Sequence, residues 1–146
     1  MSYIQPVYKG FEEFHVGDKY EGPEREILAS DIEKFAQITG DFNAIHLDEE
    51  YARKTLFGHR IAHGLYIASL LNAACSPYFG NGSIYMNHKQ YFMAPVYMGD
   101  KVTCGLEIKE KIEGKQLLVF RAYVKNQNDK IVLDGEITVK IIKPEK

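Results

Sequence analysis

An apolar stretch in the middle of the chain, residues 65–75, limits the possible folds more than any other feature of the sequence. It follows Gly64 and ends before Pro77, which is typical of a helix. Apolar side chains lie on nearly all sides of that helix, so it has no polar face to turn toward water. We therefore expect other parts of the structure to surround it.

Four stretches rich in β-branched and aromatic residues follow this helix, at residues 83–94, 101–111, 116–126 and 130–142. Turn-forming residues separate them at 99–100, 113–114 and 126–129. Alternation is clearest in the last stretch, where one face carries Ile131, Leu133, Ile137, Val139 and Ile141. The second half of the chain therefore predicts an antiparallel meander of four strands.

The first half of the chain predicts two shorter helices and a weak strand. Residues 31–39 have apolar side chains at helical spacing, with Ser30 as the N-cap, Glu33 as its capping-box partner and Gly40 as the stop. Residues 48–53 place acids first and bases last, which favours a short exposed helix. Residues 11–20 suggest an extended segment broken by a turn, and an N-terminal strand could join the sheet as an edge. A helix wrapped by antiparallel strands is an α+β architecture.

Size and composition describe an ordinary globular protein of one domain, residues 1–146. The net charge is −2 and the basic residues are scattered, which argues against a nucleic-acid partner. No segment is apolar enough to span a membrane and the N-terminus has no signal-peptide pattern, so we expect a cytoplasmic protein with no membrane partner. Cys75 and Cys104 lack metal-ligand or redox spacing, and we expect two buried thiols.

The chemistry-bearing residues lie between the predicted helices. Asp41, Asn43 and His46 place an acid, an amide and an imidazole on one short segment, and Gly64 opens the apolar helix shortly after. These groups suit proton transfer next to a carbonyl, with backbone N–H groups for the oxyanion. From local sequence alone, however, residues 40–43 are also typical of a plain helix stop and turn.

Three blocks together resemble the MaoC-like, R-specific enoyl-CoA hydratase family: residues 39–48, 61–64 and 92–100. The resemblance runs from about residue 10 to about residue 142, and its specific part is the Asp-x-Asn-x-x-His element. Family members often have proline after the asparagine, where this chain has Ala44. The family implies the hot-dog fold, a homodimer with active sites near the subunit interface, and an acyl thioester substrate.

The resemblance implies that Asp41 and His46 bind and activate water and move its protons, and that Asn43 holds the loop or the water. The backbone N–H of Gly64 would receive the thioester oxygen. The order of proton transfer between Asp41 and His46 stays open, and Phe42, Ile45 and Leu47 could wall the carboxylate. The implied reaction is reversible hydration of trans-2-enoyl thioesters of coenzyme A or acyl carrier protein to (R)-3-hydroxyacyl thioesters, with no cofactor besides that carrier.

Three alternatives remain. A hot-dog thioesterase would use a carboxylate to activate water against the thioester carbonyl, and a binding module would hold acyl thioesters without turnover. His59 and His63 have a spacing that could serve a metal with Asp48, but the turn at Gly58 argues against it, so we predict no metal and a bracing role for His63 before Gly64. We assign no role to the candidate acyl-tunnel residues Tyr66, Met86, Phe92 and Met93.

Overall fold

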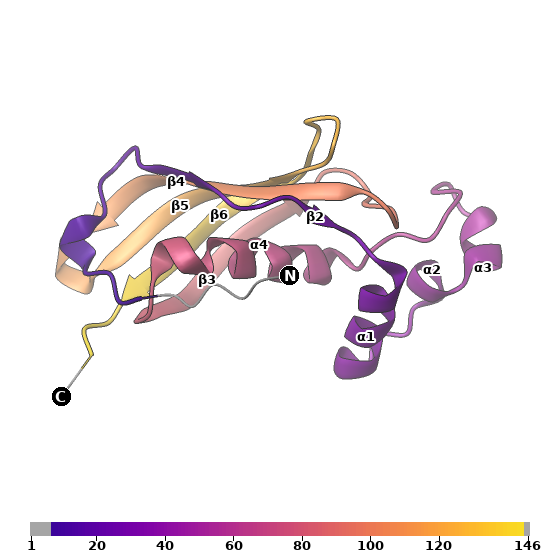
Figure 1. Ribbon diagram of the computed structural model, residues 1–146, viewed down its shortest axis with the longest axis horizontal. Helices are drawn as coiled ribbons and strands as arrows, with labels where there is room; N and C mark the ends of the chain where they lie inside the picture. The colour runs from indigo at the N-terminus through magenta and orange to yellow at the C-terminus, as the bar shows by residue number, and fades with distance from the viewer. Residues whose placement is uncertain (1–6, 145–146) are drawn as a thin grey trace.

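An antiparallel sheet curves over one long helix, as the computed structural model shows for the described residues, 7–144. The helix is α4 (Gly64–Phe79), and it lies along the concave side of the sheet (Figure 1). Three shorter helices lie beyond one end of the sheet: α1 (Ala29–Thr39), α2 (Ala44–Leu47) and α3 (Glu49–Arg53). The predicted α+β architecture, a sheet wrapped around a central helix, is confirmed.

The sheet has six strands in the order β1-β4-β5-β6-β3, with β2 also pairing with β4. Their bounds are β1 (Lys19–Glu21), β2 (Arg25–Glu26), β3 (Ser83–Phe92), β4 (Lys101–Ile112), β5 (Leu117–Lys125) and β6 (Ile131–Ile141). Strands β4, β5 and β6 form the predicted meander, and β1 joins the sheet as an edge, as expected. A short 3-10 helix (Glu113–Lys115) links β4 to β5.

The prediction of a four-strand meander is wrong for β3, which pairs with β6 at the opposite edge from β1. After β3 the chain does not turn back beside it. The link passes the start of α4, where the Ala62 N–H donates to the Val96 carbonyl at 2.7 Å, and then the Gly99 N–H donates to the Ile27 carbonyl at 2.7 Å. Strand β4 is therefore separated from β3 by β6 and β5 in the sheet, and the link brings residues 93–96 next to the helix start.

Helix α4 buries one side against the sheet and leaves the other side open. The buried side chains are Tyr66, Ile67, Leu70, Leu71, Cys75 and Phe79. The exposed ones recur at helical spacing on the opposite side: Leu65, Ser69, Asn72 and Ala73. The expectation that this chain surrounds the helix on every side is therefore wrong, and Leu65 is 64% exposed.

Several boundaries differ from those predicted. Helix α1 begins before Ser30 with Leu28 as N-cap and no side-chain cap, so the predicted capping box is wrong, whereas Gly40 ends the helix with a φ of 83° as expected. Helix α4 continues through Pro77 to Phe79, because a proline in the last turn removes few helical hydrogen bonds. Residues Phe11–Glu13 form a 3-10 helix and not an extended segment.

Strand β3 forms an apolar, exposed edge of the sheet. The exposed side chains on and just after this strand are Ile84, Tyr85, Met86, Tyr91, Phe92 and Met93. Both cysteines are buried and unpaired, as predicted. Among the described residues, none of the helices combines the length and the hydrophobicity that crossing a bilayer requires.

Candidate active site

The segment after α1 is shaped by its own side chains. Gly40 reverses the chain, and the Asp41 carboxylate then accepts a hydrogen bond from the Asn43 N–H at 3.2 Å. The Asn43 side-chain oxygen accepts from the Ile45 N–H at 3.2 Å, which makes Asn43 the N-cap of α2. Asp41 and Asn43, which form the turn, therefore also set the position of His46 in α2.

His46 is 9% exposed, and its ring has a fixed orientation. Its Nδ1 lies 2.8 Å from the Ile61 carbonyl oxygen, which can only accept, so Nδ1 carries the proton and the neutral ring leaves Nε2 bare. Burial lowers the pKa of His46, the hydrogen bond to Ile61 raises it less, and the neighbouring His63 adds to the lowering. A neutral imidazole with a bare Nε2 is ready to accept a proton.

Arg60 fixes the backbone of His46 from the other side. Its Nε donates to the His46 carbonyl at 2.7 Å, and its guanidinium lies 3.7 Å from the Glu33 carboxylate on α1. The Arg60 side chain thus joins α1 to the end of α2. The local position of His46 depends on residues from three separate segments.

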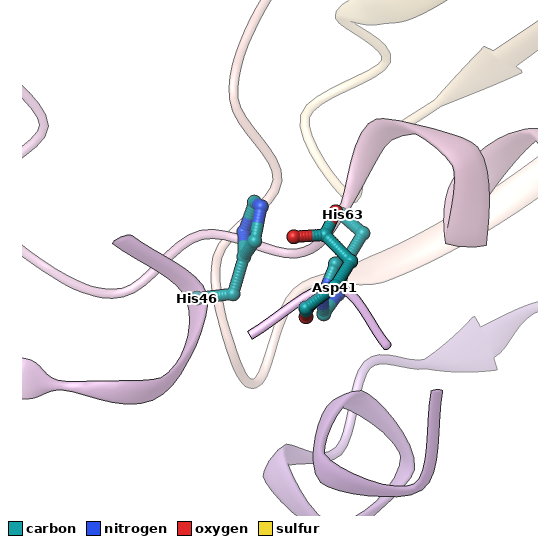
Figure 2. A group of neighbouring side chains, drawn as sticks. All are labelled: Asp41, His46 and His63. Carbon is teal, nitrogen blue, oxygen red and sulfur yellow. The ribbon is translucent and has the colours of Figure 1, made fainter. Parts of the chain in front are cut away.

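Asp41, His46 and His63 form one compact group, shown in Figure 2. One donor atom from each lies within 4.8 Å of the other two. The His46 and His63 rings stack with their centroids 3.9 Å apart and their planes 28° apart. The structure thus brings together Asp41 and His46, the two predicted acid-base residues, and adds His63, which the sequence suggested only as a brace.

Gly64 lies beside this group as the first residue of α4, where backbone N–H groups have no partner within the helix. It lines an apolar cavity of about 460 Å³ that also contains His46, Phe57, Ile67, Phe92 and Met93. A Cβ at residue 64 would come within 2.8 Å of the Phe92 ring, so any side chain there would push that ring aside. Glycine leaves space for a group to approach both the helix start and His46.

The surroundings of Asp41 differ from those expected. Asp41 is itself exposed, and Phe42 is 61% exposed, so Phe42 does not enclose the carboxylate. Ile45 and Leu47 are half-buried. Asp41 therefore lies at the surface of the chain and not behind an apolar wall that includes Phe42.

Sequence reasoning missed the walls of the cavity. Phe92 and Met93 were candidate acyl-tunnel residues without an assigned role, and Phe57 lies in the loop after the predicted helix at residues 48–53. Two signals pointed to Phe92: it was a candidate acyl-tunnel residue, and it starts the third block of the family resemblance, residues 92–100. Tyr66 belongs to the core, and Met86 lies on the exposed edge of β3.

The metal alternative that the sequence suggested is not assembled. His59 is exposed and its Nδ1 lies 3.0 Å from the Glu49 carboxylate, whereas His63 is buried against His46. The carboxylate of Asp48 instead caps α3 by accepting from the Tyr51 N–H at 3.1 Å. Asp41, His46 and His63 each bring one donor atom within 4.8 Å of the other two. In both imidazoles one ring nitrogen is already engaged with a backbone carbonyl, that of Ile61 for His46 and that of Asp41 for His63.

Comparison with known proteins identifies the family of the chain. The family described as "MaoC like domain" matches residues 12–130. The chain is 43% identical to a 3-hydroxybutyryl-CoA dehydratase of Methylorubrum extorquens over 136 residues, which is 92% of this chain and 85% of that protein. It is 37% identical to an (R)-specific enoyl-CoA hydratase of Rhodospirillum rubrum, over 79% of this chain and 80% of that protein.

Solved structures give the same result for the fold. An unliganded R-hydratase of Pseudomonas aeruginosa superimposes with a TM-score of 0.85 at 35% identity, over 97% of this chain and 89% of that one. An (R)-hydratase of Aeromonas caviae superimposes with a TM-score of 0.83 at 31% identity, over 89% of this chain and 98% of that one. The matched residues, the hot-dog fold and these relatives show that the chain belongs to the MaoC-like dehydratase family.

Proposed function

We propose that this protein is a hydro-lyase that reversibly adds water to trans-2-enoyl thioesters, giving (R)-3-hydroxyacyl thioesters. The observation that carries the proposal is the Asp41 and His46 pair, which lies beside the N-terminus of α4 at one end of an apolar cavity. Relatives whose names state this activity or its reverse span most of the chain. The thiol carrier, coenzyme A or acyl carrier protein, is part of the substrate, and we propose no other cofactor and no metal.

In the proposed reaction, His46 accepts the first proton. Its neutral ring has Nε2 free, so it takes a proton from water while the hydroxyl oxygen bonds to C3 of the substrate. The electron pair of the double bond moves to the thioester oxygen, which the Gly64 N–H and the positive end of α4 stabilise. The Asp41 and His46 pair then returns one proton to C2, so the net change is the addition of one water.

Asn43 has a supporting role in this proposal. Its side-chain oxygen is engaged with the Ile45 N–H, so it holds the loop that carries Asp41 and His46. Its amide nitrogen remains for a water or substrate group. The apolar walls of the cavity, including Phe57 and Ile67, suit the acyl chain.

We further propose that the active molecule is a homodimer. The apolar residues of edge strand β3 and the open side of α4 are both exposed, and an unpaired apolar edge favours pairing with another chain. Phe92 and Met93 belong both to that exposed surface and to the cavity, so the partner would lie next to the site. Two unpaired buried cysteines support a reducing compartment, and we propose the cytoplasm.

Incubation with crotonyl-CoA tests the reaction. Absorbance of the enoyl thioester should fall, the product should be the (R)-3-hydroxyacyl thioester by chiral analysis, and a thiol reagent should detect no free CoA. Asp41→Asn serves as the matched control and should leave the absorbance nearly constant. Release of free thiol would instead support a thioesterase, and tight binding of acyl-CoA without turnover would support a binding module. Either result would overturn the proposal.

A further inference from the structure

His63 connects the two halves of the candidate site. It is the N-cap residue of α4, directly before Gly64, and its side chain reaches back to the loop that carries Asp41. Its Nε2 lies 3.0 Å from the Asp41 carbonyl oxygen. One residue therefore joins the backbone of the acid-base loop to the start of the helix that supplies the oxyanion donor.

The hydrogen bond fixes which nitrogen of His63 carries the proton. A carbonyl oxygen only accepts, so Nε2 donates and Nδ1 of the neutral ring is bare. That Nδ1 is buried and finds no hydrogen-bond partner within residues 7–144. A buried acceptor without a partner is unfavourable. A phenyl ring would fill the same space without this cost, so packing alone does not explain an imidazole at this position.

The ring of His63 packs against two other rings. His46 stacks on one side, and the Phe35 ring of α1 lies 4.9 Å away by centroid with a tilt of 59°. Only 2% of the residue is exposed. The imidazole therefore has little freedom to turn, and its Nε2 proton stays directed at the Asp41 carbonyl.

We propose that His63 is a positioning residue of the hydratase site. Its hydrogen bond to the Asp41 backbone fixes the position of the loop that carries Asp41 and His46 relative to Gly64. The expected effect on kcat rests on the proposed function, whereas the role of the His63 hydrogen bond in holding the loop does not depend on it. His63 is not proposed to exchange protons with substrate. Its effect reaches the reaction through Asp41, whose carboxylate direction follows from its backbone.

Two substitutions of His63 separate the effect of its N–H donor from the effect of its ring packing. His63→Gln keeps an N–H donor near the position of Nε2 and removes the ring, whereas His63→Phe keeps the ring and removes the donor. Hydrogen exchange of residues 41–47 should accelerate about tenfold in His63→Phe and stay near wild type in His63→Gln, because only the former loses the hydrogen bond. His59→Phe, an exposed histidine of the preceding loop, is the matched control and should leave this exchange unchanged.

Kinetics supply the second readout. In His63→Phe, kcat for crotonyl-CoA should fall about 10²-fold with little change in KM, as expected for misplaced reacting groups, and His63→Gln should recover most of kcat. If His63→Phe does not fold, His63→Leu takes its place as the variant without a donor. The inference would be overturned if the variant without a donor had the same hydrogen exchange and the same kcat as the wild type. It would also be overturned if His63→Gln lost as much kcat as the variant without a donor. If the wild type fails to hydrate any enoyl-CoA, the proposed function falls, while the exchange comparison still decides the role of His63.

Discussion

The sheet and the candidate site are held together by different kinds of interaction. Inside the sheet, side chains such as Leu118, Phe120 and Ile137 are fully buried, and Phe120 lies against Phe79 of α4 with ring centroids 5.1 Å apart. Around Asp41 and His46, the contacts are mostly single hydrogen bonds between a side chain and a backbone group. Apolar packing therefore holds the sheet against α4, whereas the site segment depends on a few directional bonds.

This contrast leads to separate expectations for the two regions. Substitutions in the sheet core should lower stability and leave the activity of each folded molecule unchanged. Asp41→Asn should lower activity with little effect on stability, because Asp41 is exposed, and His46→Gln keeps a polar side chain at the buried His46 position. The predictions below test that division.

The largest effect is expected for the acid-base pair. Asp41→Asn and His46→Gln should each reduce kcat/KM for crotonyl-CoA by roughly 10²–10⁴-fold, the usual contribution of a positioned acid or base. Steady-state kinetics and thermal unfolding of the same preparations provide the measurement. A large drop in melting temperature with a proportional loss of activity would show that these residues stabilise the fold, and it would contradict the division between the sheet core and the site.

The next effect concerns the sheet core. Phe120→Ala should lower the free energy of unfolding by about 3–5 kcal/mol, because a large aromatic side chain is removed and a cavity remains. Denaturant titration measures the change, and kcat below the unfolding transition should match the wild type. Val16→Ala, at an exposed residue outside the sheet, is the control and should change stability by less than about 0.5 kcal/mol.

A smaller effect is expected at the start of α4. In Gly64→Ala the new methyl group would meet the Phe92 ring, whose displacement narrows the approach to the helix N-terminus. We expect kcat/KM to fall about 10²-fold with little loss of stability, since the Phe92 ring is exposed and can move. Gly114→Ala is the matched control, because no atom lies within 4 Å of a Cβ built there. Equal activity of the two variants would exclude Gly64 from the site.

The smallest effect is a pH dependence from His46. Burial lowers its pKa below the ordinary 6.5, so its neutral state adds stability above pH 6.5 that is lost as pH falls through the lowered pKa. Between pH 7 and 5, the melting temperature should fall more for the wild type than for His46→Gln. The acid limb of kcat/KM should lie below pH 6.5 for the same reason. An acid limb above that value would show that His46 is not the neutral base.

Much of the fold could be predicted because it follows local patterns. The apolar run before Pro77 indicated α4, and alternation indicated the strands that include Leu133 and Val139. Strand neighbours could not be predicted this way, because a period of two identifies a buried face and does not say which strand lies beside it. The position of β3 next to β6 depends on how the link at residues 93–100 crosses the helix start.

The candidate site shows the same limit. Asp41 and His46 lie close together in sequence, so their proximity could be predicted from a short motif. The approach of Phe92 to Gly64 and the bond from His63 to Asp41 join segments that are distant in sequence, and they depend on packing. The open side of α4 could not be predicted either, because apolar periodicity does not distinguish a helix face that the same chain covers from one that it leaves exposed.

The central claim, that Asp41 and His46 act as one catalytic unit on an enoyl thioester, is tested most directly by a double-mutant cycle. The kcat of wild type, Asp41→Asn, His46→Gln and the double variant should be measured with crotonyl-CoA at one pH. If the two residues act as a unit, the kcat of the double variant should be only slightly lower than that of the less active single variant. A double variant whose loss equals the product of the two single losses would contradict the claim, and near-wild-type rates in both single variants would refute the site.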